Sequence, residues 1–96
     1  MEHADAPAAA SARVVICNRR GLHARASARF VQCAEQFDAA ITVTRDGESV
    51  AGTSIMGLMA LAAGFGSEIE ISAVGREAVP AIAALRALVE CGFNER

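Results

Sequence analysis

The chain has 96 residues, of which 53% are hydrophobic and 21% are charged, and its formal net charge at pH 7 is −2. This length suffices for one small domain with its own core and leaves no room for a second domain. All nine basic residues are arginines in a slightly acidic chain, which argues against a nucleic-acid partner, and no apolar run is long enough for membrane insertion.

The N-terminal segment is expected to form a flexible tail. Residues 1–11 are rich in alanine, contain one proline and follow neither helical nor strand periodicity. They carry acids where a secretory signal would need cations before an apolar run, so we expect the protein to be cytoplasmic. A single domain is predicted over residues 12–96.

The domain is expected to open with a strand followed by an amphipathic helix. A β-branched run predicts a strand over residues 12–18. Apolar residues then recur at helical spacing over residues 24–37. The apolar face of this helix consists of Phe30, Val31, Ala34 and Phe37, and its polar face of Arg25, Arg29, Gln32 and Gln36.

The rest of the chain alternates strand and helix patterns. Asp46-Gly47 is a typical two-residue hairpin turn, and Thr53 or Ser54 can cap the helix that follows. The further elements are predicted, in chain order, as strands over 39–45 and 48–51, a short helix over 55–63, a strand over 67–74 and a helix over 77–90. This βαββαβα order indicates an α+β fold: a four-stranded, mainly antiparallel sheet with three helices on one face.

A histidine lies at the predicted start of the first helix, in the stretch "GLHARAS". Backbone N–H groups at a helix start lack intrahelical acceptors and attract anions, and Arg25 lies close enough to bind the same anion. The neutral imidazole of His23 is a nucleophile that could carry a phosphoryl group there. A lone histidine beside arginines is more often a plain surface residue, so the residues alone indicate only a histidine-centred anion site.

The three cysteines, Cys17, Cys33 and Cys91, are odd in number and show no CxxC spacing. Each lies inside an apolar pattern. We therefore expect buried, reduced thiols without a catalytic or metal-binding role.

Two motifs in register, "GLHARAS" and "TSIMGLM", resemble those of the HPr family, the histidine-containing phosphocarriers of the bacterial phosphotransferase system. The resemblance spans about residues 12–92 and implies an HPr-like open-faced β-sandwich. It implies that His23 accepts phosphate from phosphorylated enzyme I and passes it to an enzyme II A-type acceptor. Arg25 and the N–H groups of Ala24 and Arg25 would hold the phosphate, with no bound cofactor or metal. The chain would be a stoichiometric carrier and not an enzyme.

The second motif suggests regulation and docking. By resemblance, Ser54 aligns with a serine that an HPr kinase/phosphorylase modifies in some members, although Thr53 replaces the usual lysine before it. The apolar strip of Ile55, Met56 and Met59 is expected to be partly exposed and to dock enzyme I and downstream acceptors. Arg29 is expected to help steer acidic partners. In the first motif of the family, a proline follows the arginine that corresponds to Arg25, and this chain has Ala26 at that position.

Two other functions fit the same element order. The first is a small acylphosphatase-like hydrolase, which would need an arginine and an asparagine to orient water but no histidine. The second is a regulatory ligand-binding module. Replacing His23 would abolish only the phosphocarrier function. The ending "ALVECGFNER" resembles the nitrogen-related branch of the family and "SIMGLM" the sugar-uptake branch, so the branch stays open.

Overall fold

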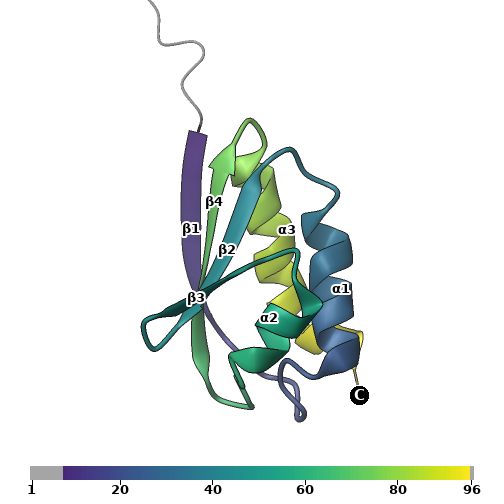
Figure 1. The fold of residues 1–96 in the computed structure, drawn as a ribbon. Coiled ribbons are helices and arrows are strands. Elements are labelled where there is room, and N and C mark those ends of the chain that lie inside the picture. The colour runs from purple at the N-terminus through teal and green to yellow at the C-terminus, as the bar shows by residue number, and fades with distance from the viewer. Residues whose placement is uncertain (1–7, 96) are drawn as a thin grey trace, which may run out of the picture.

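The computed structural model describes residues 8–95 (Figure 1). Four strands and three helices alternate along this part of the chain, followed by a short 3₁₀ helix. Their bounds, in chain order, are β1 Ala8–Val15, α1 Ala24–Ala34, β2 Ala40–Arg45, β3 Glu48–Ala51, α2 Ile55–Ala60, β4 Glu68–Gly75, α3 Ala78–Glu90 and the 3₁₀ helix Gly92–Asn94. The βαββαβα order predicted from the sequence is confirmed.

The strands form one sheet in the order β1-β4-β2-β3, and every neighbouring pair is antiparallel. The three helices cover one face of this sheet and leave the other face open (Figure 1). This is the open-faced β-sandwich expected from the sequence. Because β4 lies between β1 and β2, the two central strands come from different halves of the chain.

The core lies between the sheet and the helices. Alternate residues of β4, Ile69 and Ile71, are at most 1% exposed, as are Phe30 of α1 and Leu85 of α3. Burial of such side chains is worth about 1.5–3 kcal/mol each relative to exposure in water. The core therefore holds α1 and α3 firmly against the sheet, and α1 carries the site described below.

The hairpin between β2 and β3 has the predicted turn. Asp46 and Gly47 both have positive φ, 50° and 83°. These values suit the type I′ turn, whose twist matches that of antiparallel strands. Glycine takes this conformation without strain, and aspartate tolerates it better than most residues.

Several predicted boundaries are wrong; the second helix, for example, ends at Ala60 instead of residue 63. The first strand begins at Ala8 and ends at Val15, so the last four residues of the predicted tail belong to the sheet; the rest of that tail, residues 1–7, lies outside the described residues. Alanines 8–10 pair with β4, and this pairing overrides their weak strand propensity. The first helix ends at Ala34 instead of Phe37, because the chain tightens there into i→i−3 hydrogen bonds.

The cysteine prediction is partly wrong. All three thiols are free, but Cys17 and Cys91 are exposed and Cys33 is half-buried. Cys17 lies between the buried residues Ile16 and Asn18, so its side chain takes the outward position of an extended chain. Burial raises the pKa of the Cys33 thiol, which makes it less reactive.

Residues 8–95 include no helix that is long and apolar enough to cross a membrane. Nor do three or more His, Cys, Asp or Glu side chains gather there in a group that could hold a metal ion.

Candidate functional site

The loop between β1 and α1 places the histidine. Asn18 donates a hydrogen bond from Nδ2 to the Gly21 carbonyl (2.8 Å), and Leu22 N donates to the Ala63 carbonyl (3.0 Å). Gly21 has a φ of +65°, and a Cβ there would lie 2.3 Å from the Ala63 oxygen. Only glycine fits this close approach of two backbones. The loop is therefore fixed against the segment that follows α2.

His23 is the N-cap residue of α1, with φ −75° and ψ −178°. Its carbonyl accepts the first intrahelical hydrogen bond, from Ser27 N (2.9 Å), but its side chain caps no backbone N–H. The Ser27 hydroxyl instead donates to the Leu22 carbonyl (3.1 Å). The N–H groups of Ala24 and Arg25 thus have no intrahelical acceptor, and the first turn of α1 contains no acid. This end of α1 favours an anion.

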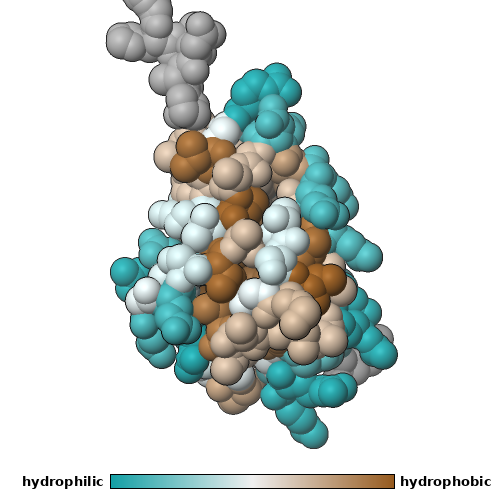
Figure 2. Space-filling model, in the orientation of Figure 1, coloured by the Kyte–Doolittle hydropathy of each residue, from teal (hydrophilic) through white to brown (hydrophobic). Residues whose placement is uncertain are grey.

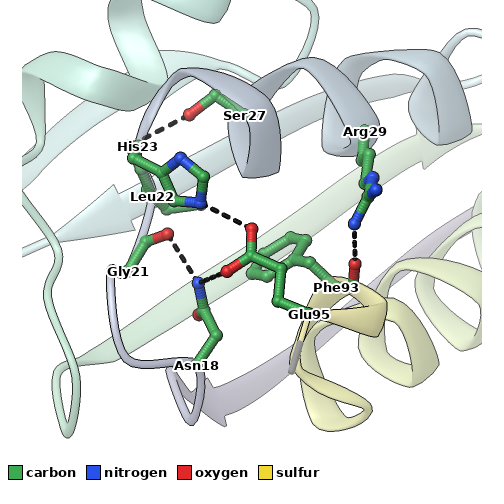
Figure 3. A network of polar contacts seen from close by, with 8 residues as sticks. All are labelled: Asn18, Gly21, Leu22, His23, Ser27, Arg29, Phe93 and Glu95. Atoms are coloured by element: carbon green, nitrogen blue, oxygen red, sulfur yellow. Dashed lines mark hydrogen bonds and ion pairs between the residues drawn. The ribbon is translucent and has the colours of Figure 1, made fainter.

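The ring of His23 is held from one side by the C-terminal segment. Its Nε2 lies 2.5 Å from Oε2 of Glu95, and Glu95 Oε1 accepts a hydrogen bond from Asn18 Nδ2 (3.0 Å). The His23 and Glu95 side chains are only 16% and 17% exposed. Figure 3 shows the other ring nitrogen, Nδ1, turned away from Glu95. The two nitrogens therefore have different surroundings.

The electrostatics keep Glu95 ionised. Partial burial raises the pKa of this carboxyl, but hydrogen bonds from Asn18 and His23, together with the electrostatic attraction of the His23 ring and the Arg29 guanidinium, lower it by more. The net result is a pKa below the ordinary value of 4.5. At neutral pH, Glu95 is therefore a carboxylate that accepts hydrogen bonds.

The His23 side chain lines a shallow depression in the protein surface, with a volume of about 260 Å³. Its described lining consists of Arg20, His23, Arg25, Arg29, Asn94 and Glu95. Three arginines against one acid make this lining suitable for a phosphoryl group, which carries close to two negative charges at pH 7. Arg25 is exposed, whereas Arg29 is half-buried and donates a hydrogen bond to the Phe93 carbonyl.

The structure brings together most of the residues predicted for the first motif. His23 immediately precedes α1, Ala24 and Arg25 are its first two residues, and Arg29 lies one turn after Arg25, on the lining of the same depression. The contact of Arg29 with the C-terminal turn was not predicted from the sequence, and its steering role stays a prediction.

Sequence reasoning missed two residues of the site. Glu95 lies 72 residues from His23, and Asn18 was predicted only as the last residue of the first strand. No spacing rule links positions so far apart. A carboxylate following "GFN" at the end of a helical pattern carries no signal of its own.

The second motif lies on α2, which packs against α1 (Figure 1). Ser54 is the N-cap residue of α2, and its Oγ accepts a hydrogen bond from Gly57 N (2.9 Å). The strip of Ile55, Met56 and Met59 is 40%, 80% and 42% exposed, which confirms the predicted exposure. Figure 2 shows hydrophobic surface over α2, with hydrophilic residues at the margins of this face.

Comparison with known proteins adds to this geometry. A profile of the family described as "PTS HPr component phosphorylation site" matches residues 10–91. A phosphocarrier protein HPr of Treponema pallidum is 45% identical over 82 residues, which is 85% of this chain and 93% of that protein. A phosphocarrier protein NPr of Shewanella violacea is 39% identical over 83 residues, covering 86% and 91% of the two chains.

Solved structures of similar proteins share the fold. The crystal structure of an HPr from Thermoanaerobacter tengcongensis superposes with a TM-score of 0.87 at 40% identity, covering 91% of this chain and 98% of that one. An HPr from Bacillus anthracis gives a TM-score of 0.81 at 45% identity, covering 85% and 98%. The likeness therefore extends over the sheet and all three helices.

Proposed function

This chain belongs to the HPr family of phosphocarriers of the phosphotransferase system, and on that premise we propose that His23 is the residue that carries the phosphoryl group, on Nδ1. The observation that supports this most is the position of His23 as N-cap of α1, beside unsatisfied N–H groups and in a depression lined by arginines. Members of this family are carriers, not enzymes. The acylphosphatase-like and ligand-binding alternatives are not favoured.

Each group at the site has a part in the proposed transfer. The Nδ1 lone pair of His23 forms a bond to the phosphorus, the bond from phosphorus to the donor atom breaks, and its electron pair leaves with the donor. The N–H groups of Ala24 and Arg25 and the Arg25 guanidinium bind the phosphoryl oxygens. Neither a metal nor a cofactor is needed for this exchange.

Family membership implies partners of the phosphotransferase system. We assign phosphorylated enzyme I as the donor and an enzyme II A-type protein as the acceptor. The shared docking surface consists of the strip of Ile55, Met56 and Met59 together with Arg29, which lines the His23 depression. Exposed methionines adapt their shape to several partners, which supports a surface that must bind a donor and then an acceptor. The cytoplasmic location predicted above stays a prediction.

The same proposal includes regulation at Ser54. A phosphate on its Oγ would add close to two negative charges at the margin of the docking strip. An HPr kinase/phosphorylase is the proposed modifying enzyme. Relatives named HPr and NPr both match the chain, so the acceptor is proposed by class and the branch is left open.

Intact mass spectrometry tests the proposal. Incubation with enzyme I and phosphoenolpyruvate is expected to add one acid-labile phosphoryl group to the protein. The group should be absent from His23→Ala and present in His3→Ala, which removes the only other histidine. A His23→Ala protein that still gains the phosphoryl group would show that another residue is the acceptor.

A further inference from the structure

We propose that Glu95 is a positioning residue for phosphoryl transfer: its carboxylate holds the proton on Nε2 of His23, aims Nδ1 at the phosphoryl donor and compensates the positive charge that the ring gains. This inference rests on the proposed role of His23 as acceptor. It adds a residue from the far end of the chain to the site.

The geometry favours a directed hydrogen bond over a chance surface contact. The Nε2–Oε2 distance is 2.5 Å and both side chains are mostly buried, so the pair is poorly screened by solvent. An ionised carboxylate can only accept, so the proton of the shared hydrogen bond belongs to Nε2. A neutral imidazole protonated on Nε2 has its lone pair on Nδ1, the nitrogen that faces away from Glu95 (Figure 3).

Asn18 fixes the carboxylate in place. Its Nδ2 donates both to Glu95 Oε1 and to the Gly21 carbonyl. Both partners are acceptors, so the amide can only be oriented this way round. Its Oδ1 is then buried with no partner among the described residues, which costs about 1–3 kcal/mol. The Asn18 amide is thus buried at a cost in stability, and its two hydrogen bonds fix the position of Glu95 relative to the loop that carries His23.

The C-terminal segment is anchored well enough to present Glu95. Phe93 is fully buried, and its carbonyl accepts a hydrogen bond from Arg29. Phe93 has a positive φ of 57°, a conformation that a bulky residue keeps only when its surroundings enforce it. Asn94 follows with a φ of 60°, which asparagine tolerates. The Glu95 N–H donates to the Gly92 carbonyl (3.0 Å). Glu95 is thus held by packing before any phosphate arrives.

The charge balance of the transfer gives Glu95 its role. When the Nδ1 lone pair forms the N–P bond and the donor leaves with its electron pair, the proton stays on Nε2 and the ring becomes a cation. The carboxylate touches the nitrogen that bears this proton, whereas the phosphoryl group binds on the other side of the ring. Because Coulomb energy falls with distance, attraction to Nε2–H exceeds repulsion of the more distant phosphoryl oxygens.

Transfer kinetics provide the first test. Quenched-flow measurement of phosphoryl acceptance from phosphorylated enzyme I should give a rate about tenfold lower for Glu95→Ala than for the wild type. A loss of this size is typical when the hydrogen bond that orients a functional histidine is removed. Glu95→Gln, which keeps the shape and an acceptor but loses the charge, should fall between Glu95→Ala and the wild type. The concentration of carrier at half-maximal rate should barely change, because Glu95 acts on the ring and not on docking.

Glu90→Gln is the matched control. Glu90 is an exposed acid five residues earlier, paired with Arg86 at 3.0 Å, so its replacement removes the same charge from the same end of the chain. Its transfer rate should equal that of the wild type. An unchanged or faster rate in Glu95→Ala, or an equal loss in Glu90→Gln, would overturn the proposal.

Nitrogen-15 NMR of histidine-labelled protein supplies a second test, because its signals report which nitrogen of the His23 ring carries the proton. This protonation site would not change on replacing Glu95 if Glu95 had a purely structural role. In a His3→Gln background the one remaining imidazole is His23. A slowly exchanging proton on Nε2 is expected in the wild type and in Glu90→Gln, and it should be lost in Glu95→Ala. A ring protonated on Nδ1 in the wild type would contradict the inference. Because Glu95→Ala is still expected to become fully phosphorylated and His23→Ala is not, failure of this inference and failure of the acceptor assignment are distinguishable.

Discussion

The two nitrogens of the His23 ring have separate surroundings, and this division is the main feature of the site at the scale of single residues. Nε2 contacts a carboxylate from the end of the chain, while Nδ1 faces away from it. The residues on the Nδ1 side were predictable, because "GLHAR" places them within a few positions of one another. Glu95 and Asn18 were not, because only the folded chain brings them to the ring.

Replacing Arg25 tests the proposed anion site. Arg25→Ala should slow phosphoryl acceptance by about tenfold, equivalent to about 1.4 kcal/mol of transition-state stabilisation. Arg25→Lys should recover part of this loss, because lysine keeps the charge without the two-pronged donor geometry. Arg86→Ala, which changes an exposed arginine of α3, is the control. Equal rates for Arg25→Ala and the wild type would remove Arg25 from the mechanism.

At the scale of elements, the first turn of α1 departs from the family pattern. The family proline is Ala26, the third residue of the helix, and its N–H is among those without an intrahelical acceptor. A proline there would remove no intrahelical hydrogen bond and would limit the freedom of the unfolded chain.

Ala26→Pro should therefore raise the melting temperature by about 2–5 °C, the shift expected from about 0.4–1 kcal/mol in a domain of this size. Phosphoryl transfer should be at least as fast as in the wild type, because the loop that presents His23 becomes more rigid. Thermal unfolding and quenched-flow kinetics measure the two effects. A slower transfer in Ala26→Pro would count against a rigidifying role for the family proline.

The cap of α2 links the proposed modification to docking. Ser54→Asp keeps an N-cap acceptor and adds a negative charge at the margin of the docking strip. We expect a higher half-saturating concentration for enzyme I with little change in the maximal rate. Ser11→Asp places the same charge on the exposed edge strand β1 and should leave both values unchanged. If the two variants behave alike, the effect is not specific to the docking strip.

The element ends show where sequence reasoning is weakest. The spacing of hydrophobic residues and the turn residues identified all four strands and the three α-helices. However, β1 begins four residues earlier and α1 ends three residues earlier than predicted. Alanines carry little propensity of their own, so pairing with β4 decides the start of β1. Phe37 has the right spacing for the helix face, yet the chain turns before it to reach β2.

At the scale of the whole molecule, the site depends on contacts between the two ends of the described chain. The order β1-β4-β2-β3 places the β1–α1 loop beside the end of α3, and Asn18, His23 and Arg29 all bind the last turn. Periodicity within segments predicts the elements and their buried faces. It contains no information about which distant segments meet, so the strand order was not predicted from the sequence and is known only from the structure.

The contact of Glu95 should make stability depend on pH in a defined direction. The pKa of this carboxyl is lowered by folding, so its contribution is complete above the ordinary value of 4.5 and is lost as the pH falls through the lower folded value. Urea unfolding at pH 7 should show Glu95→Gln less stable than the wild type by about 1 kcal/mol. The difference should vanish at acid pH. A constant difference across this range would mean that the ionised carboxylate is not the stabilising species.

The most direct test of this account is to locate the phosphoryl group after transfer from enzyme I. Nitrogen-15 and phosphorus-31 NMR of the phosphorylated, histidine-labelled protein identify both the residue and the ring atom. We predict a single phosphoryl group on Nδ1 of His23. A phosphoryl group on Nε2, or on any residue other than His23, would contradict it.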